Sequence, residues 1–548
     1  MQYDELGLSS ALKMPGSLSR YLKRGSVNHQ QPVLKKEGIM KTSRRNFLKT
    51  AAAGMGSAGL MTSITACDQV EKWDDEAEVV VLGIGAAGLM TAITAYDQGA
   101  DVLILEKAPE AHAGGNTRVS GQGYWCPSDS DKAMEYQNAL SDGFPIPDDV
   151  TQAFHEHSIH VTEWLTKMGA DMRTIPTAGE YPDFPGGAGN VCWSTKGNGY
   201  QRLWLLLMEN ALQKRKVRVQ YETPAVELIR DVKSGEIRGV VAENKGKKVH
   251  VKAKKAVVLC TGGFENNQEM IRDYLGMPCG YPKGSPYNTG DGIRMAMAIG
   301  ADLWHMDNQA GPDFNFRIPG KDWAFGYNFS PAGQGWIWIA KDATRFTNEA
   351  YSTKHGKIPF HGIYIHVPTP LPVHCVFDET MRKSGPLYPP KYMFCWWAQI
   401  EKYDWSPDSS AGIEKGWILK ADTLKALAGK IDKDPEALEK TVVAWNKSCA
   451  AGNDSEYSRD PKKMAPIKTP PFYAAEFVPA FTNTQGGLRR NKNAQVLDTN
   501  REPIPRRYSA GELGAIYSWD SQGGGNILEC IVFGRIAGEQ ASAEQSWA

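Results

Sequence analysis

The feature that most constrains the fold is the glycine-rich segment Gly83–Gly88, which separates an apolar run from an alanine-rich run. Residues 79–82 are apolar and mostly β-branched, which is typical of a buried parallel strand, and residues 86–95 favour a helix. In this G-x-G-x-x-G pattern Gly83 permits a tight turn, Gly85 lets backbone approach a pyrophosphate, and Gly88 allows close helix–strand packing. The helix N-terminus offers unpaired N–H groups to phosphates, so the segment predicts a dinucleotide site.

A second strand and its terminal acid strengthen this prediction. Residues 102–105 are apolar and are followed by Glu106, about 20 residues after the glycines. An acid at this position is placed to bind ribose hydroxyls. Further along, the apolar run 256–259 stops at a T-G-G-F turn, and a glycine run at 523–525 precedes a helix predicted at 528–540. We expect both segments to return to the dinucleotide-binding sheet and to add glycine turns beside the ligand.

The first residues of the chain resemble export signals. Residues 1–39 are polar and aperiodic, and we expect them to be a disordered or non-native extension, with translation starting at Met40. Residues 43–49 match the twin-arginine pattern S-R-R-x-F-L-K. We therefore expect a twin-arginine signal at 40–67. It would export a protein already folded around its cofactor to the periplasm or the cell-envelope surface.

The end of this signal leaves two outcomes open. Residues 64–67 resemble a lipobox, whose cysteine is lipidated after cleavage, and the alternative is simple cleavage nearby. The mildly apolar stretch 51–66 is too short and too rich in glycine to span a bilayer. A membrane contact is therefore expected only if Cys67 is lipidated, and simple cleavage would leave none.

Charge and cysteine spacing exclude several other functions. The formal net charge is +0 at pH 7, so no nucleic-acid partner is indicated. The 9 cysteines are scattered without C-x-x-C pairs, which argues against zinc, iron–sulfur and c-type haem sites and against a disulfide framework. A helix predicted at 147–172 carries His155, His157 and His160. A metal site is one interpretation, but no carboxylate or cysteine matches them, and we expect solvated histidines.

A change in composition predicts a separate domain in the middle of the chain. Up to about residue 311 glycine-rich turns recur, at 114–123 and 288–292. From 312 to 468 Trp, Tyr, Phe and Pro dominate, with an extended pair expected at 337–339 and 376–378 and helices at 420–429 and 435–449. We expect 77–311 and 469–548 to form the two parts of the dinucleotide-binding domain and 312–468 to form a cap.

Taken in order, the motifs of residues 77–545 resemble the flavoprotein family of fumarate reductase, soluble flavocytochrome c, urocanate reductase and 3-ketosteroid dehydrogenase. They are G-I-G-A-A-G, L-E-K, A-G-G-N-T, T-G-G-F, T-G-D-G, R-F-x-N-E at 345–349, A-Q-V-L-D, P-I-P, A-G-E, and G-G-N followed by F-G-R-I-A-G. The resemblance implies an α/β protein with a Rossmann-type FAD-binding domain and an inserted α+β capping domain. It implies noncovalent FAD, because Asn116 stands where some membrane-bound members carry a flavin-linking histidine.

The resemblance and the glycine turns together indicate which residues bind FAD. The expected cofactor-binding residues are Gly83, Gly85, Ala86, Ala87, Gly88, Glu106, Lys107, Gly114, Gly115, Asn116, Thr117, Gly121, Gln122, Gly123, Val226, Thr261, Gly262, Gly263, Asp291, Gly511, Glu512, Gly525, Asn526 and Ile527.

The positions that anchor dicarboxylates in fumarate reductases differ in this chain. Gly311 stands in place of a His, Gln522 in place of an Arg, and Thr353 in place of the Arg that donates a proton. A His-His pair is replaced within the T-N-T-Q segment at 482–485. A buried substrate carboxylate without its partner would cost on the order of several kcal/mol. The substitutions therefore argue against reduction of a dicarboxylate.

We expect an enzyme that reduces the C=C bond of a neutral enone or arylacrylate-type small molecule by hydride transfer from the flavin. Neutral amides suit an uncharged carbonyl, and the candidate substrate-binding residues are Gln485, Gln522 and Asn483. The candidate proton donors are Tyr351, Lys354 and His355. A separate cytochrome or quinol-linked protein would supply electrons. Two alternatives stay open: a 3-ketosteroid-type dehydrogenase running the reverse reaction, and a non-catalytic electron-transfer flavoprotein.

Overall fold

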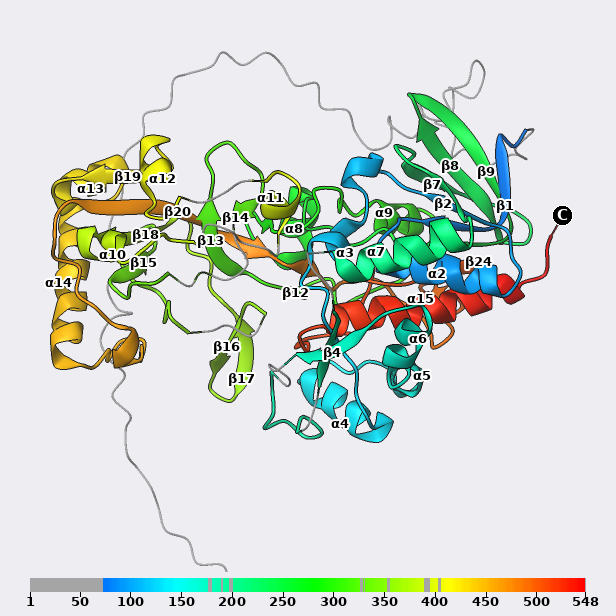
Figure 1. Cartoon of the computed structure of the whole chain (residues 1–548), viewed down its shortest axis with the longest axis horizontal. Helices are drawn as coiled ribbons and strands as arrows, with labels where there is room; N and C mark the ends of the chain where they lie inside the picture. The colour runs from blue at the N-terminus through cyan, green and yellow to red at the C-terminus, as the bar shows by residue number, and fades with distance from the viewer. Residues whose placement is uncertain are drawn as a thin grey trace, which may run out of the picture. The chain divides into compact units, whose positions relative to one another are not determined.

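The structure is a computed structural model that describes residues 72–175, 180–188, 191–196, 201–325, 329, 331–351, 355–388, 395–402 and 406–547 (Figure 1). Of the two units into which the chain divides, Met1–Thr65 and Ala66–Ala548, only the second holds described residues. The predicted extension at 1–39, the predicted signal at 40–67 and the candidate proton donor Lys354 therefore lie outside the described residues.

The glycine-rich segment follows β1, a central strand of an eight-stranded sheet, which is called the first sheet here. Its strand order is β23-β24-β9-β1-β2-β6, and β7 and β8 extend it from β9. β1 pairs in parallel with β2 and with β9, and β24 joins β9 in parallel. The parallel α/β sheet expected from the sequence is thereby confirmed. The strands are β1 (Asp75–Leu82), β2 (Val102–Leu105), β6 (Arg218–Gln220), β7 (Ala225–Arg230), β8 (Ile237–Asn244), β9 (Lys247–Leu259), β23 (Gln495–Leu497) and β24 (Pro503–Ser509).

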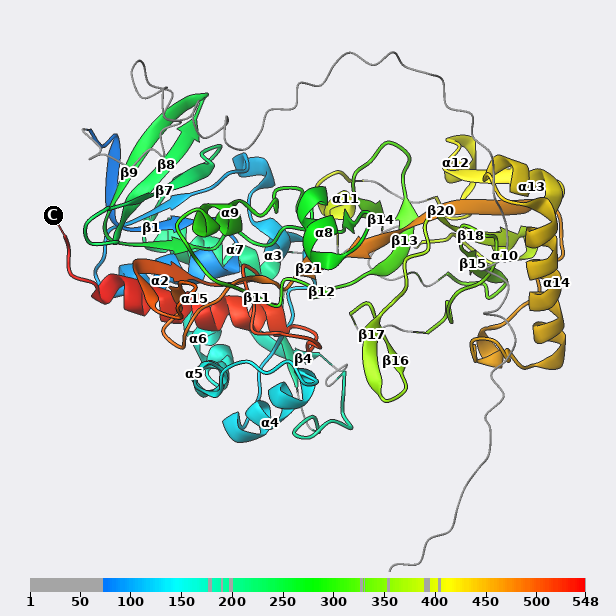
Figure 2. The ribbon, with the colours of Figure 1, turned by 180° about the vertical axis from the view of Figure 1, so that it is seen from behind.

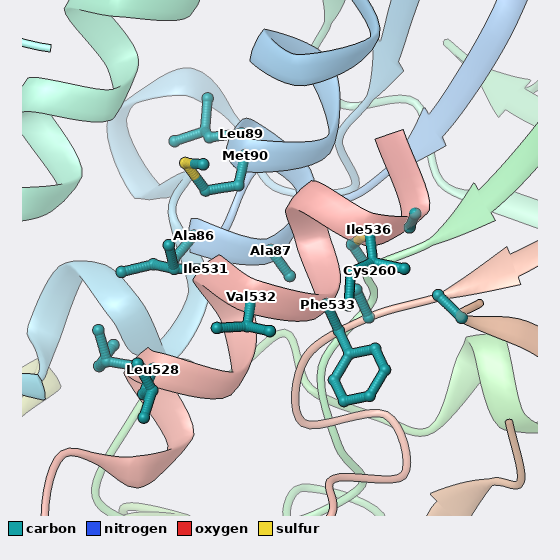
Figure 3. Close-up of a cluster of buried hydrophobic side chains, with 14 of the residues drawn as sticks. Ala86, Ala87, Leu89, Met90, Cys260, Leu528, Ile531, Val532, Phe533 and Ile536 are labelled. Carbon is teal, nitrogen blue, oxygen red and sulfur yellow. The ribbon is translucent and has the colours of Figure 1, made fainter. Parts of the chain in front are cut away.

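Both faces of the first sheet are covered, which is why residues 79–82 are uniformly apolar. On one face lie α2 (Ala86–Asp97) and the C-terminal helix α15 (Gly525–Ala543), which cross closely in Figure 3. Gly534 of α15 permits the approach, because a Cβ there would lie 2.7 Å from the carbonyl oxygen of Ala87. On the other face β7, β8 and α9 (Asp291–Met297) enclose a second apolar cluster.

Shorter elements complete this part of the molecule. The small strands β3 (Tyr124–Trp125), β4 (Met172–Ile175) and β5 (Cys192–Thr195) form a sheet of their own. The remaining helices are the 3-10 turn η1 (Glu110–His112), α3 (Gly115–Val119), α4 (Ser130–Leu140), α5 (Asp148–Ser158), α6 (Val161–Lys167), α7 (Arg202–Met208), its π-helical continuation η2 (Glu209–Lys214) and α8 (Gln268–Leu275).

The helix expected at 147–172 is wrong in extent, because the chain forms α5 and α6 with a break at 159–160. The expectation of solvated histidines is also wrong for His155, which is fully buried between Trp125 and Phe154. Burial lowers the pKa of His155 to about 3, so this side chain is a neutral part of the core. His160, by contrast, is exposed.

The cap is built on a seven-stranded sheet, called the second sheet here, whose main order is β14-β13-β20-β18-β15. The expected extended pair is confirmed, since β15 (Trp336–Ile339) pairs antiparallel with β18 (Val373–Asp378). The boundary expected at 468 is too early. β20 (Phe472–Phe481), a long apolar strand assigned above to the second part of the FAD-binding domain, pairs with β13, β18 and β19.

The other strands of the second sheet are β10 (Tyr281–Pro282), β13 (Asp313–Arg317), β14 (Ala324–Phe325) and β19 (Ile418–Ala421), and Figure 2 shows the cap from behind. The hairpin of β16 (Lys357–Phe360) and β17 (Ile363–His366) is a separate two-stranded sheet. The helices are α10 (Glu379–Lys383), α11 (Trp396–Gln399), α12 (Ser410–Glu414), α13 (Leu424–Lys430), α14 (Pro435–Ala451) and the 3-10 turn η3 (Pro461–Lys463).

The R-F-x-N-E motif lies inside the cap and forms a buried ionic cluster. Arg345 binds the carboxylates of Glu349 and Asp454, with N–O distances of 2.7 and 2.8 Å. Arg459 lies 3.4 Å from Glu349 and stacks on the Trp336 ring. The carboxylates therefore have cationic partners within the core of the cap, so the motif ties the loop after β15 to the chain after α14.

Two short ribbons connect the sheets. β12 (Gln309–Ala310) pairs with β21 (Asn483–Thr484), and β11 (Leu303–Trp304) pairs with β22 (Gly487–Leu488). Figures 1 and 2 both place β12 between the two sheets. Among the described residues no helix has the length and apolar character to cross a bilayer. The same residues contain no group of three or more His, Cys, Asp or Glu suited to hold a metal ion.

Candidate functional site

Two adjoining cavities lie where the glycine turns meet. The first, of about 100 Å³, runs along the carboxyl ends of the parallel strands of the first sheet. The second, of about 390 Å³, extends from it toward the cap. Both are lined by Asn116, Thr117, Glu512 and Cys530, which form their common wall. In open α/β sheets the carboxyl ends of the strands are the usual place for a ligand.

The structure brings most of the expected cofactor-binding residues to these cavities. The first is lined by Gly83, Gly85, Ala86, Ala87, Glu106, Lys107, Gly115, Asn116, Thr117, Thr261, Gly262, Asp291, Gly511 and Glu512. The second is lined by Gly121, Gln122, Gly123, Asn526 and Ile527, together with Asn483, Gln522 and His355. Six residues expected to bind cofactor or substrate line neither cavity, namely Gly88, Gly114, Gly263, Gly525, Val226 and Gln485.

The glycine turn is shaped by close backbone contacts. Gly83 has φ +101°, and a Cβ there would lie 2.4 Å from the carbonyl oxygen of Cys260. A Cβ on Gly88 would lie 2.0 Å from the carbonyl oxygen of Gly83, so any side chain would push α2 away from the turn. Around Gly85 the nearest atom to such a Cβ is 3.7 Å away, which leaves that side open to the cavity. Gly83 and Gly88 therefore keep the turn closed, and Gly85 keeps it accessible.

Glu106 is fixed before any ligand arrives. Its Oε2 accepts the Ile84 N–H at 2.9 Å, and its Oε1 accepts the Ala108 N–H at 2.7 Å. Burial raises the pKa of this carboxyl, against the opposing effect of the two amides. The neighbouring Lys107 is bound to Asp291 at 2.7 Å, so β2 and α9 are joined by an ion pair at the edge of the first cavity.

Asn116 lies between two buried carboxyl groups. Its Nδ2 donates to Glu265 Oε1 at 2.7 Å and to Glu512 Oε2 at 3.0 Å, and its Oδ1 accepts the Ser285 N–H. Burial and the nearness of Glu265 raise the pKa of Glu512 well above its usual value. Burial and the closeness of the two carboxyl groups therefore favour a proton on the pair. Sequence reasoning did not include Glu265, although it directly follows the T-G-G-F turn.

Three polar atoms at the cavity walls have no partner within the described part of the chain. They are the Thr261 hydroxyl, Glu512 Oε1 and Asn526 Oδ1. Each of these residues lines one or both cavities. Buried polar groups normally find a hydrogen-bond partner, so these atoms fit a bound ligand rich in hydroxyls and ring N–H groups.

Two of the three side-chain amides expected to bind substrate already form hydrogen bonds within the protein. Gln522 Oε1 accepts from the Tyr136 hydroxyl at 2.7 Å, and its Nε2 points to the Gly523 carbonyl at 3.3 Å. Asn483 Oδ1 accepts from Asn526 at 3.1 Å. Both side chains line the second cavity. Gln485 is buried outside the cavity, and neither end of its amide has a partner among the described residues.

Of the candidate proton donors, His355 is the one that the structure places in the second cavity. Its Nε2 lies 2.7 Å from Glu180 Oε2. Burial disfavours the charged imidazolium, but the carboxylate of Glu180 outweighs that effect and raises the pKa of His355. Tyr351 has 37% of its surface exposed and does not line the cavity, and Lys354 lies outside the described residues. Glu180 itself was not expected from the sequence.

The second cavity has another ion pair in its wall. Lys283, which is almost fully buried, binds Asp313 at 2.9 Å. Lys283 and His355 are the cationic side chains that line this cavity within the described ranges, and each lies against a carboxylate. The wall therefore offers a ligand paired charges rather than a free cation.

Gly311 stands at the position where the resemblance to fumarate reductases implies a His, and backbone packs closely around it. A Cβ on Gly311 would lie 2.8 Å from the carbonyl oxygen of Ala480. On the other side Gly356 presses against it, since a Cβ on Gly356 would lie 1.9 Å from the carbonyl carbon of Gly311. The Gly311 N–H donates to the His355 carbonyl at 2.8 Å. Backbone of the segment that carries His355 thus lies against Gly311.

The fold and the first cavity define a dinucleotide-binding protein, and the second cavity adjoins this site on the side of the cap. The chain belongs to the FAD binding domain family, whose model matches residues 78–528. The flavoprotein resemblance, the FAD cofactor and the Rossmann-type architecture expected from the sequence are thereby confirmed. The protein is an FAD-dependent oxidoreductase.

Two characterised relatives show the range of this family. The chain is 28% identical over 487 residues to the fumarate reductase (cytochrome) of Shewanella frigidimarina, covering 85% of this chain and 77% of the relative. It is 26% identical over 501 residues to the vinyl phenol reductase of Lactiplantibacillus plantarum, covering 85% and 97%. The 3-ketosteroid Δ1-dehydrogenase structure from Sterolibacterium denitrificans has the same fold, with a TM-score of 0.67, 23% identity, and coverage of 86% and 100%.

The cavities suit this cofactor. The first cavity has glycine backbone at the start of α2 in its lining, the place where dinucleotide-binding proteins hold a pyrophosphate, together with Glu106. Thr261, Glu512 and Asn526, which each have a buried polar atom without a partner among the described residues, also line the cavities. Asn116 is an amide already bound to two carboxyl groups, which agrees with FAD held without a covalent link.

Proposed function

We propose that this protein reduces the C=C bond of a neutral enone or an arylacrylate-type small molecule. The observation that carries the proposal is the second cavity, which shares a wall with the cofactor cavity and whose cations are already paired with carboxylates. A dicarboxylate would have to break those pairs or remain without a counter-charge, at a cost on the order of several kcal/mol. A neutral conjugated molecule carries no such cost.

In this reaction bound FAD supplies a hydride equivalent to one carbon of the double bond. The protein has to hold the substrate against the common wall, keep water out and deliver a proton to the other carbon. Asn483 and Gln522 line the second cavity and are our candidates for contacting the substrate. His355 is the described titratable cation at that cavity with a raised pKa, and we assign it the proton.

The alternative is the reverse reaction, in which a saturated ketone is dehydrogenated. The similarity to the 3-ketosteroid Δ1-dehydrogenase structure supports it at the level of fold. The same cavity would then accept a proton from the substrate. The raised pKa of His355 favours its protonated form, so a proton acceptor is the less suitable role for it.

We further propose that the protein is exported and receives electrons from a separate cytochrome or quinol-linked protein. The twin-arginine pattern at 43–49 supports export. The similarity to a fumarate reductase (cytochrome) supports the kind of partner, while this chain has no C-x-x-C-H haem attachment in its sequence.

The proposal is tested by anaerobic reoxidation of the reduced holoprotein. Protein reduced with viologen is mixed with 2-cyclohexenone, methyl cinnamate, cinnamate or fumarate, and the flavin absorbance is followed. We expect reoxidation by a neutral conjugated substrate at least about 100-fold faster than by fumarate, because each missing charge partner costs a few kcal/mol. Faster reoxidation by fumarate, or dye reduction driven by a saturated ketone, would contradict the proposal.

A further inference from the structure

We propose that Glu180 and His355 act together as the proton-delivery pair of the second cavity. In this pair His355 is the catalytic residue, and Glu180 is the positioning residue that fixes the imidazole through Nε2. The other ring nitrogen, Nδ1, is then the atom that gives the proton to the substrate. The inference rests on the proposed reduction of a C=C bond and adds to it the residue that orients the acid.

The carboxylate of Glu180 is held on more than one side. Its Oε2 accepts from His355 Nε2 at 2.7 Å and from the Gly523 N–H at 2.8 Å. The N–H of Glu180 donates to Gln522 Oε1 at 3.1 Å. Gly523 directly precedes the glycine that caps α15, so the carboxylate is fixed to the start of the C-terminal helix. A carboxylate held in this way can orient a ring as well as attract its charge.

The hydrogen bond to Glu180 leaves the other ring nitrogen of His355, Nδ1, for the substrate. Nε2 of His355 is engaged by Glu180, and none of the described residues forms a hydrogen bond with Nδ1. The backbone of His355 is fixed too, because its carbonyl accepts the Gly311 N–H at 2.8 Å. Since both Glu180 and His355 line the second cavity, the free nitrogen belongs to the side chain that a bound substrate meets.

The charges around the ring favour a protonated state at rest. The Glu180 carboxylate and the more distant Asp313 raise the pKa of His355, while burial and Lys357 lower it, and the net direction is upward. Asp313 is bound by Lys283, and Asp520 is the remaining carboxyl that acts on the ring. Burial raises the pKa of Asp520 to about 6 and lowers that of Lys357 to about 8.

His355 supplies the proton that completes the reduction of the double bond. One carbon of the substrate double bond receives the hydride with its two electrons, and the π electron pair forms a new C–H bond at the other carbon. The proton for that bond comes from Nδ1–H of the imidazolium, whose N–H bond breaks. The ring becomes neutral with its remaining proton on Nε2, donated to Glu180. Water then restores the proton on Nδ1.

The test measures reoxidation of reduced holoprotein by an enone that oxidises the parent protein, in stopped flow. We expect His355→Gln to slow the step about 100-fold or more, since a positioned acid contributes 10²–10⁴-fold. We expect Glu180→Gln to slow it about 10-fold or more with little change in KM, and Glu180→Asp to recover part of the rate. Glu163→Gln, which removes an exposed carboxylate of α6, is the control and keeps the parent rate.

The pH profile distinguishes the loss of the Glu180–His355 interaction from a general disturbance of the structure. The rate falls as pH rises through the pKa of His355, because the donating form is the imidazolium. In Glu180→Gln the carboxylate that raises this pKa is gone, so the fall moves to lower pH. The ring ¹³C shift in ¹³C-histidine-labelled protein, assigned with His355→Gln, reports the same displacement without turnover.

The outcomes distinguish the two proposals. A Glu180→Gln variant with the parent rate, pH profile and imidazole titration would overturn the pair. If no enone reoxidises the parent protein, the proposed function fails, while the histidine titration still decides whether Glu180 controls the charge of His355. If Glu180→Gln loses its bound flavin, Glu180→Asp takes its place in the test. A His355 titration in Glu180→Asp identical to that of the parent would also count against the pair.

Discussion

At Gly88 the close packing of the glycine turn against α2 leaves no room for a side chain. A methyl group there would meet the carbonyl oxygen of Gly83 at 2.0 Å, and that oxygen belongs to the turn that shapes the site. We expect Gly88→Ala to lower the stability by about 1–3 kcal/mol or more, the usual cost of overpacking, and to weaken FAD retention. Release of flavin fluorescence on heating measures both effects.

Gly429→Ala provides the matched control. Gly429 is exposed near the end of α13, and a Cβ there would meet no atom within 4 Å. Since Gly costs roughly 0.5–1 kcal/mol relative to Ala in a helix, this variant is expected to melt at the parent temperature or slightly above it. Equal melting temperatures for Gly88→Ala and Gly429→Ala would refute the packing role of Gly88.

Single residues also show how far sequence reasoning reaches. The spacing of strand, glycines and helix predicts Gly83 and Glu106, whereas Asn116 follows from the resemblance to the flavoprotein family. Glu180 and Glu265 were missed because their roles depend on residues far away in the chain. Glu180 meets His355, and Glu265 meets Asn116. No local pattern marks such contacts, so the carboxyl partners of the site became visible only in the structure.

At the scale of elements, the ionic cluster of the cap is the part that one substitution should weaken most. Glu349 is fully buried and is bound by Arg345 and Arg459. We expect Glu349→Gln to cost about 3–5 kcal/mol, because it leaves buried guanidinium charge without its carboxylate. Urea unfolding followed by Trp fluorescence measures this, since Trp336 and Trp445 stack on Arg459.

The control for this variant is Glu163→Gln. Glu163 pairs with Lys167 on the exposed face of α6. Exposed pairs contribute little, so the unfolding midpoint should stay at that of the parent. A similar midpoint for Glu349→Gln would mean that the R-F-x-N-E motif does not stabilise the cap.

Helices and strands were predictable from the sequence where a single residue pattern, such as an apolar run, dominates the segment. The apolar runs before the glycines became β1 and β9, and the extended pair expected in the aromatic-rich region became β15 and β18. The helix expected at 147–172 divides at 159–160 into α5 and α6, a break that the apolar pattern does not mark. The cap boundary moved because β20 pairs with strands of the second sheet that lie far from it in sequence. Long-range pairing of this kind has no local signature.

For the whole molecule, export is the prediction that reaches beyond the described residues. We expect the double variant Arg44→Lys, Arg45→Lys to accumulate as folded flavoprotein in the cytoplasm, because the twin-arginine route requires the Arg pair. Cell fractionation with flavin fluorescence measures it. A variant with the same pair unchanged and Lys41→Arg substituted should fractionate like the parent. Normal export of the double variant would refute the twin-arginine interpretation.

The wall shared by the two cavities bears on how inhibitors of this protein should be sought. Asn116, Thr117, Glu512 and Cys530 line both spaces, so a molecule bound in one cavity lies next to the other. Protein stripped of FAD would leave the first cavity open to other ligands. A ligand screen on stripped protein would then select compounds that compete with the cofactor. A screen on the loaded protein would select compounds that compete with the substrate.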